Sequence, residues 1–171
     1  GEVRIVVGLR EVVARMRDGA EVEMDMGAVE VGETETIRVA DEDVELTPVS
    51  VGNPHAVIRR EPERAELLRL GPLVETHERF PERTNVQLVS VGGRHELAVG
   101  VWERGAGETL SSGTSAVATA AAAVANAWCE SPVTVHLAGG DLLVELADGR
   151  ARLTGPAEEI CLVELAEEFA L

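Results

Sequence analysis

The feature that most constrains the fold is an alanine-rich segment, Ser112–Trp128, which is apolar on nearly every side. A helix at a protein surface needs a polar face, so a helix that is apolar all round is buried inside its domain. Short β-branched or alternating runs, which are typical of strands, lie both before and after this segment. We therefore expect an α+β fold in which strands wrap around a central buried helix as a barrel.

The strands are expected to be mostly antiparallel, because turn signals join them as hairpins. Strands are expected at Val3–Gly8, Glu11–Met16, Glu21–Met26, Thr36–Ala40, Val44–Val51, Val86–Val91, His95–Trp102, Val133–Leu137, Leu142–Leu146, Ala151–Thr154 and Ile160–Leu165. The turns are expected at Asp18-Gly19, Gly92-Gly93, Gly139-Gly140 and Asp148-Gly149. A short helix is expected over Glu61–Leu70. Its first turn would hold Pro62, and its inner face would carry Ala65 and Leu68, joined by Leu67.

The charge balance restricts the class of protein. The 171 residues include 15 basic and 31 acidic side chains, a formal net charge of −16. That balance argues against nucleic acid and anionic lipid as partners, since both require clustered positive charge. No apolar run reaches the length of a membrane span, the first residues do not form a signal peptide, and two cysteines cannot form a disulfide framework. We expect a cytoplasmic protein.

The first candidate site segment is Gly52-Asn53-Pro54-His55, which follows an expected strand. Asn-Pro is a turn signal, so the Asn53 amide and the His55 ring should lie near a strand end. The alternative is a plain turn in which Asn53 bonds its own backbone and His55 is solvated. The second segment is the loop Phe80–Val86, in which Asn85 stands just before a strand; a capping or turn role is the alternative there.

The third segment, Glu103–Ser115, combines a charged strand end with a glycine-rich loop that opens the buried helix. The free N–H groups and positive dipole end of such a helix form a site for a carboxylate or a phosphate. The alternatives are Ser112 as an ordinary N-cap, and Glu103 and Arg104 as solvated charges. A GxxxxGK[ST] phosphate loop is excluded because the chain has no lysine.

Together these segments resemble one family. The strings VSVGNPHAV, LGPLVETHERFPERTNV, VWERGAGETLSSGTSA and LTGPA follow the C-terminal half of diaminopimelate epimerases, from about Val49 to Pro156, and EVEMDMG extends the likeness weakly over Glu2–Gly27. The resemblance implies two similar barrel-like halves with the substrate between them. It also implies cofactor-independent, metal-free interconversion of LL- and meso-diaminopimelate in lysine biosynthesis. In that family one cysteine removes the α-proton as thiolate, and a second delivers a proton from the opposite side.

The resemblance assigns roles to particular positions. Ser112 occupies the place of the second catalytic cysteine, Glu103 that of its acidic partner, and His55 that of the residue assisting the first cysteine. The implied substrate contacts are the side chains of Asn53, Asn85, Glu103 and Arg104, and the backbone of Gly113 and Thr114, which would hold the reacting-end carboxylate. The expected small-molecule substrate is diaminopimelate, with no cofactor.

Two departures from the family pattern lower the expected activity. A thiol of pKa about 8.5 costs roughly 2 kcal/mol to ionise at pH 7, whereas a hydroxyl near 15.7 costs roughly 12. The family's N-terminal half is also absent, and neither Cys129 nor Cys161 lies in a family motif. We expect weak or no epimerisation by this chain alone. The alternatives are a catalytically dead half that binds amino-acid carboxylates or pairs with another subunit, and a related proline or hydroxyproline racemase.

The expected organisation follows from the resemblance. Residues 1–30 are expected to be strands that belong to, or lead from, the missing N-terminal half. Residues 31–158 would form the epimerase-like domain, and residues 159–171 a last strand and an acidic, frayed tail. An exposed sheet edge near the start would suit a partner, either an N-terminal half or a second copy of the chain.

Overall fold

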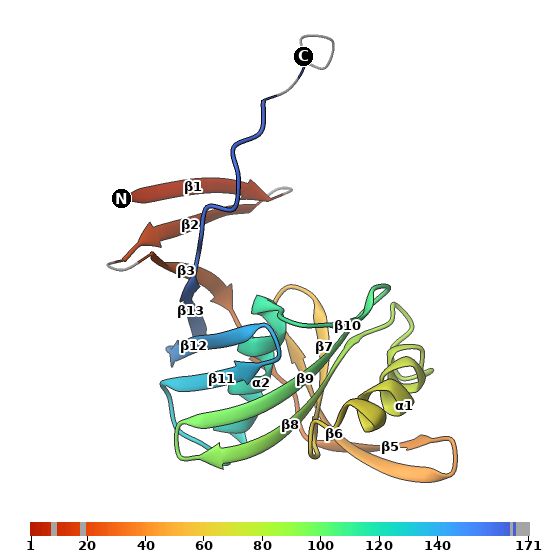
Figure 1. Cartoon of the computed structure of the whole chain (residues 1–171). Coiled ribbons are helices and arrows are strands. Elements are labelled where there is room, and N and C mark those ends of the chain that lie inside the picture. The colour runs from red at the N-terminus through yellow and green to blue at the C-terminus, as the bar shows by residue number, and fades with distance from the viewer. Residues whose placement is uncertain (8–9, 18–19, 165, 167–171) are drawn as a thin grey trace.

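A computed structural model describes residues 1–7, 10–17, 20–164 and 166, which form one large sheet and two helices (Figure 1). The strands are β1 (Glu2–Val7), β2 (Arg10–Met16), β3 (Glu21–Ala28), β4 (Glu30–Val31), β5 (Glu35–Val39), β6 (Glu42–Ser50), β7 (Pro54–Arg59), β8 (Asn85–Gly93), β9 (Glu96–Glu103), β10 (Gly107–Thr109), β11 (Val133–Leu137), β12 (Gly140–Ala147) and β13 (Arg150–Pro156). The helices are α1 (Arg64–Glu75) and α2 (Gly113–Ala125). None of the described helices is long and apolar enough to span a membrane.

The sheet is mixed and open. Its strand order is β1-β2-β3-β13-β12-β11-β9-β8-β7-β6-β4, with β10 beside β9 and β5 beside β6. The pairs β7–β8 and β9–β11 are parallel and the other pairs are antiparallel, which confirms the mostly antiparallel prediction. The expected barrel is not confirmed, because in the described residues no pairing joins the β1 end of the sheet to the β4 end.

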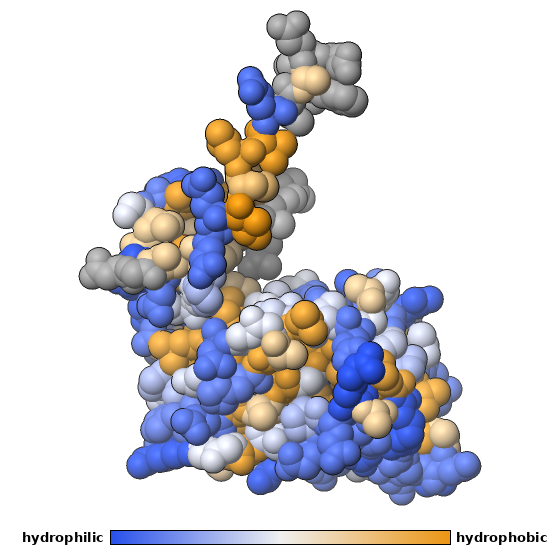
Figure 2. All heavy atoms as spheres, in the orientation of Figure 1, coloured by the Kyte–Doolittle hydropathy of each residue, from blue (hydrophilic) through white to orange (hydrophobic). Residues whose placement is uncertain are grey.

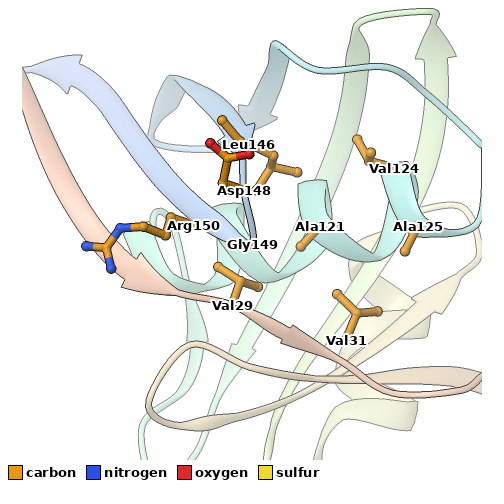
Figure 3. A pocket seen from close by; sticks show the side chains of 10 residues that line it. Val29, Val31, Ala121, Val124, Ala125, Leu146, Asp148, Gly149 and Arg150 are labelled. Carbon is orange, nitrogen blue, oxygen red and sulfur yellow. The ribbon is translucent and has the colours of Figure 1, made fainter.

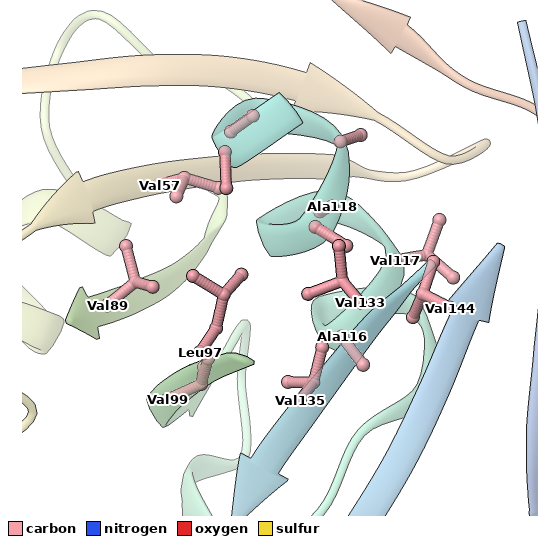
Figure 4. Close-up of a cluster of buried hydrophobic side chains, with 14 of the residues drawn as sticks. Val57, Val89, Leu97, Val99, Ala116, Val117, Ala118, Val133, Val135 and Val144 are labelled. Carbon is pink, nitrogen blue, oxygen red and sulfur yellow. The ribbon is translucent and has the colours of Figure 1, made fainter. Parts of the chain in front are cut away.

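Helix α2 is buried, as its sequence predicts. Every residue from Ser115 to Ala123 is buried, and the helix contacts strands from β4 to β13. Figure 4 shows Ala116, Val117 and Ala118 among valines and leucines of the surrounding strands. The small alanine side chains let these strands approach the helix closely, so a core with few aromatic residues is still filled.

Helix α1 differs from its prediction in position and in face. It begins at Arg64, after Pro62, and it continues to Glu75. Its inner face carries Leu67, Leu70 and Val74. The predicted inner residues Ala65 and Leu68 are exposed, because the apolar stripe at helical spacing continues to Val74, beyond the predicted end at Leu70, and that stripe packs on β8 and β9.

Three strands were not predicted. Strand β7 begins at Pro54, the second residue of the Asn-Pro turn signal, because the first residue of a strand can lack a backbone N–H. Strands β4 and β10 are two and three residues long, too short for alternation to identify them.

The turn between β8 and β9 falls at Arg94-His95, since Gly93 pairs with Glu96.

The predicted strand at Ile160–Leu165 is wrong for its described part. Residues 157–164 pair with no strand, and Ile160 and Leu162 are each 94% exposed. Figure 2 shows apolar residues, in orange, on the segment that extends from the main body toward the C-terminus. Leu165, most of the acidic tail and the predicted turn at Asp18-Gly19 lie outside the described residues.

Candidate active site

The candidate residues gather where strands of the sheet end and α2 begins. The parallel pairing of β7 with β8 sets His55 opposite Asn85. The Asn85 side chain is buried, donates from Nδ2 to the Pro54 carbonyl oxygen at 2.9 Å, and accepts from the Arg104 backbone N–H at 3.0 Å. Asn85 therefore ties the Gly52–His55 turn to the end of β9, which is more than a local cap or turn role.

Ser112 and Glu103 are in direct contact. The Ser112 hydroxyl donates to Glu103 Oε2 at 3.2 Å. Ser112 has the extended backbone of an N-cap residue, but its side chain caps no N–H of α2. Ser112 is thus the N-cap residue of α2 by position, as the alternative had it, but its hydroxyl bonds Glu103 and not the helix backbone. Glu103 is half-buried and hydrogen-bonded, whereas Arg104 is exposed and donates to the Glu82 carbonyl oxygen at 3.1 Å.

His55 lies inside the protein, not in solvent. Its ring is 1% exposed; Nε2 is 3.1 Å from Asn53 Oδ1, and Nδ1 is 3.1 Å from Gln87 Nε2. Burial lowers the pKa of His55 to about 4, and the nearby charge of Arg104 acts in the same direction. The ring is therefore neutral at pH 7, with each nitrogen facing one amide side chain.

Glu75 is a buried carboxylate that the sequence analysis did not single out. It accepts from Trp102 Nε1 at 2.7 Å and from the Gly105 backbone N–H at 3.0 Å, and its Oε1 lies 3.5 Å from Arg83 Nη1. The Trp102 hydrogen bond, joined by that of Gly105, lowers the pKa of Glu75. The ionised carboxylate fixes the turn after β9, which carries Glu103 and Arg104.

The predicted residues do not share one closed cavity. Asn53 and His55 line a cavity of about 500 Å³ together with Pro54, Phe80 and Glu82, but Ser112 and Glu103 are not part of its wall. A second, apolar groove of about 230 Å³ holds none of the predicted residues. Its walls come from the segment around β4, from α2 and from the β12–β13 turn (Figure 3).

Neither cysteine takes part in these contacts. Cys129 is buried in the hydrophobic core, and burial raises the pKa of its thiol, which keeps it protonated. Cys161 is exposed, in the irregular segment that follows β13. Within the described ranges of the chain, no three His, Cys, Asp or Glu side chains are grouped so that they could hold a metal ion.

Comparison of the sequence with known proteins identifies the relatives of this chain. The family model described as diaminopimelate epimerase matches residues 47–160. The chain is 47% identical over 132 residues to a diaminopimelate epimerase of Desulfitobacterium hafniense, covering 76% of this chain and 47% of that protein. It is 49% identical over 119 residues to one of Bacillus licheniformis, covering 67% of this chain and 42% of that protein. The chain thus spans less than half the length of these relatives.

Comparison with solved structures supports the fold. A predicted epimerase from Pseudomonas aeruginosa superimposes with a TM-score of 0.65 at 22% identity, covering 95% of this chain and 67% of that one. A probable proline racemase from Agrobacterium radiobacter gives a TM-score of 0.69 at 16% identity, covering 92% of this chain and 57% of that one. At such identities the likeness concerns the fold alone.

Proposed function

We propose that this chain, which belongs to the diaminopimelate epimerase family, forms one side of an active site that interconverts LL- and meso-diaminopimelate. The observation that carries the proposal is the contact between Ser112 and Glu103 at the start of α2. The family places a proton-transferring residue and its acidic partner at these two positions. The polar side chains of Asn53, Asn85 and Arg104 would contact the substrate beside them.

The substrate's carboxylate would bind at the first turn of α2. Because the Ser112 side chain does not cap this turn, the backbone N–H groups of Gly113 and Thr114 can donate to an anion. The positive end of the helix dipole favours the same charge. This part of the site uses only backbone groups, so serine at position 112 leaves it intact.

Proton transfer is the weaker part of the site. Glu103 would accept the Ser112 proton while the Ser112 oxygen takes the proton from the substrate's α-carbon, so that one proton moves at each bond. Ionising a hydroxyl at pH 7 costs roughly 10 kcal/mol more than ionising a thiol, by the difference of their usual pKa values. We therefore expect slow exchange or none with serine at this position.

The opposite face of the substrate would be covered by further protein, supplied as an N-terminal half or by a second copy of the chain. Residues 1–30 would be part of that contact, since β1 is an edge strand and Val3, Ile5 and Val6 are exposed. Residues 159–171 would contribute through Ile160, Leu162 and Val163, whose apolar side chains are also exposed. The first cysteine of the family would come from this other half.

A second candidate is a binding half without turnover, and serine at position 112 is the observation that favours it. Such a protein would bind meso-diaminopimelate and exchange no α-proton. A proline or hydroxyproline racemase is not favoured, because its support is the fold alone, at 16–18% identity.

The test separates binding from proton transfer. Calorimetry with meso-diaminopimelate measures binding, and deuterium uptake at the α-carbon from D₂O measures proton transfer. The chain is assayed alone and with the N-terminal half of the Desulfitobacterium relative added. We expect binding, with little deuterium uptake by the native chain and at least tenfold more by Ser112→Cys in the presence of the added half.

Glu103→Gln in the Ser112→Cys background is the matched control, since it keeps the size of the side chain and removes the proton acceptor. It should abolish the gain in deuterium uptake. Absence of binding heat would contradict the proposed site. Steady deuterium uptake by the native chain alone would contradict the weak role given to Ser112.

A further inference from the structure

A row of polar side chains, buried except at its Asn53 end, joins the Gly52–His55 turn to the first turn of α2. It runs from Asn53 through His55 and Gln87 to Ser115. Gln87 and Ser115 are fully buried, and His55 is 1% exposed. Gln87 stands in the middle of the apolar strand β8, where a valine or leucine would satisfy packing, so its amide needs a separate explanation.

The contacts of Gln87 fix the direction of its hydrogen bonds. Nε2 lies 3.1 Å from His55 Nδ1 and 3.0 Å from Ser115 Oγ, and Oε1 has no partner. The two amide hydrogens can thus serve both neighbours, and one acceptor is left over. Turning the amide over would leave two buried N–H donors unpaired, which is the costlier arrangement.

The N–H group that Gln87 donates to His55 determines which ring nitrogen of His55 carries the proton. A ring nitrogen that accepts a hydrogen bond carries no proton, so the neutral ring is protonated at Nε2. Nε2–H then donates to Asn53 Oδ1 at 3.1 Å. This bond leaves the Asn53 NH₂ group, which has no hydrogen-bond partner among the described residues, on the wall of the 500 Å³ cavity.

We infer that Gln87 is a positioning residue, which holds the His55 proton on Nε2 and thereby presents the Asn53 NH₂ group as a donor to an acceptor in the cavity. The ligand part of this inference rests on the proposed function, in which that acceptor is an oxygen of the amino-acid substrate. Through Ser115, the same amide connects the Asn53 turn to the helix start that would bind the substrate carboxylate. Gln87 therefore fixes the position of the Asn53 turn relative to the first turn of α2.

The tautomer of His55 can be measured on the chain without any ligand. Two-bond ¹H–¹⁵N NMR spectra of the ¹⁵N-labelled protein distinguish Nε2–H from Nδ1–H. We expect Nε2–H in the native chain. In Gln87→Glu the new carboxylate can only accept, so the proton should move to Nδ1 and the ring should titrate at a higher pH than in the native chain.

Ser115→Ala is the matched control, because it removes the other partner of Gln87 and leaves the His55 contact in place. Its spectrum should keep Nε2–H. Gln87→Met keeps the length of the side chain without a donor, and it should weaken meso-diaminopimelate binding about tenfold if the Asn53 donor is lost.

Nδ1–H in the native protein would overturn the inference, as would Nε2–H retained in Gln87→Glu. The native spectrum decides the first point even where a variant fails to fold. The readouts also keep the two proposals apart: Nδ1–H in a native chain that still gives binding heat refutes this inference alone, and the expected tautomer without binding heat refutes the proposed function alone.

Discussion

The buried imidazole of His55 makes the protein's stability depend on pH in a predictable way. Its pKa is about 4 in the folded state and about 6.5 when the chain is unfolded. Below pH 6.5 the unfolded state takes up the proton first, so falling pH favours unfolding. The neutral, buried imidazole contributes about 3.4 kcal/mol to the free energy of unfolding above pH 6.5, and this contribution is lost as the pH falls through 4. About 2 kcal/mol of it is lost between pH 7.5 and pH 5.

The assay is urea unfolding of the native chain and of His55→Gln at pH 7.5, 6.5, 5.5 and 5. Glutamine is neutral throughout this range and can still donate and accept a hydrogen bond. Carboxylates and the other histidines are common to both proteins, so they cancel in the difference between the two curves. Between pH 7.5 and pH 5, the free energy of unfolding should fall by about 2 kcal/mol more in the native chain than in the variant. Parallel curves would refute the argument, because they would mean that His55 titrates alike in the folded and unfolded chain.

Three further predictions concern packing, the buried carboxylate and the overall charge. Gly71→Ala would set a Cβ 2.6 Å from Trp102 Cγ, so it should lower the free energy of unfolding in urea by about 1–3 kcal/mol. Gly92→Ala is the control and should change the free energy of unfolding little, because its Cβ would meet nothing nearer than 3.6 Å. Glu75→Gln keeps only one acceptor oxygen for the two donors, Trp102 Nε1–H and Gly105 N–H, so it should lower the free energy of unfolding by about 1–3 kcal/mol at pH 7. An unchanged urea midpoint would count against the anchoring role of Glu75. Raising NaCl from 20 mM to 0.5 M should raise the melting temperature, because the net charge of −16 repels itself and salt screens it; a falling melting temperature would show that ion pairs dominate.

The sequence predicts most strands and the buried helix because their patterns are local. The alanine-rich run of α2 and the Asp148-Gly149 turn between β12 and β13 are examples, and both occur where expected. The turn needs two residues with positive φ, and Asp148 and Gly149 have φ of 53° and 71°. The start of α1 and the absence of a strand over the described residues 160–164 depend on tertiary packing, which a local pattern does not contain.

The candidate site follows the same division. Ser112 is in contact with Glu103, and Asn85 makes hydrogen bonds to two separate segments, while the roles of these residues stay predictions. Gln87 and Glu75 were not identified, although Gln87 interrupts the apolar run Val86–Val89 and Glu75 directly follows the apolar pair Leu73-Val74. The sequence shows such an exception but not its partners, because Gln87 and Ser115 are 28 positions apart.

Glu75 explains how an exposed turn can hold the half-buried Glu103 in place. The turn after β9 has few apolar contacts, since Arg104, Gly105 and Ala106 are all exposed. Its position is instead set by an ionised carboxylate on α1, which accepts from Trp102 on one side of the turn and from the Gly105 N–H within it. Bonds to a charged acceptor are about twice as strong as neutral ones. The orientation of Glu103 toward Ser112 therefore depends on a helix that contributes none of the proposed site residues.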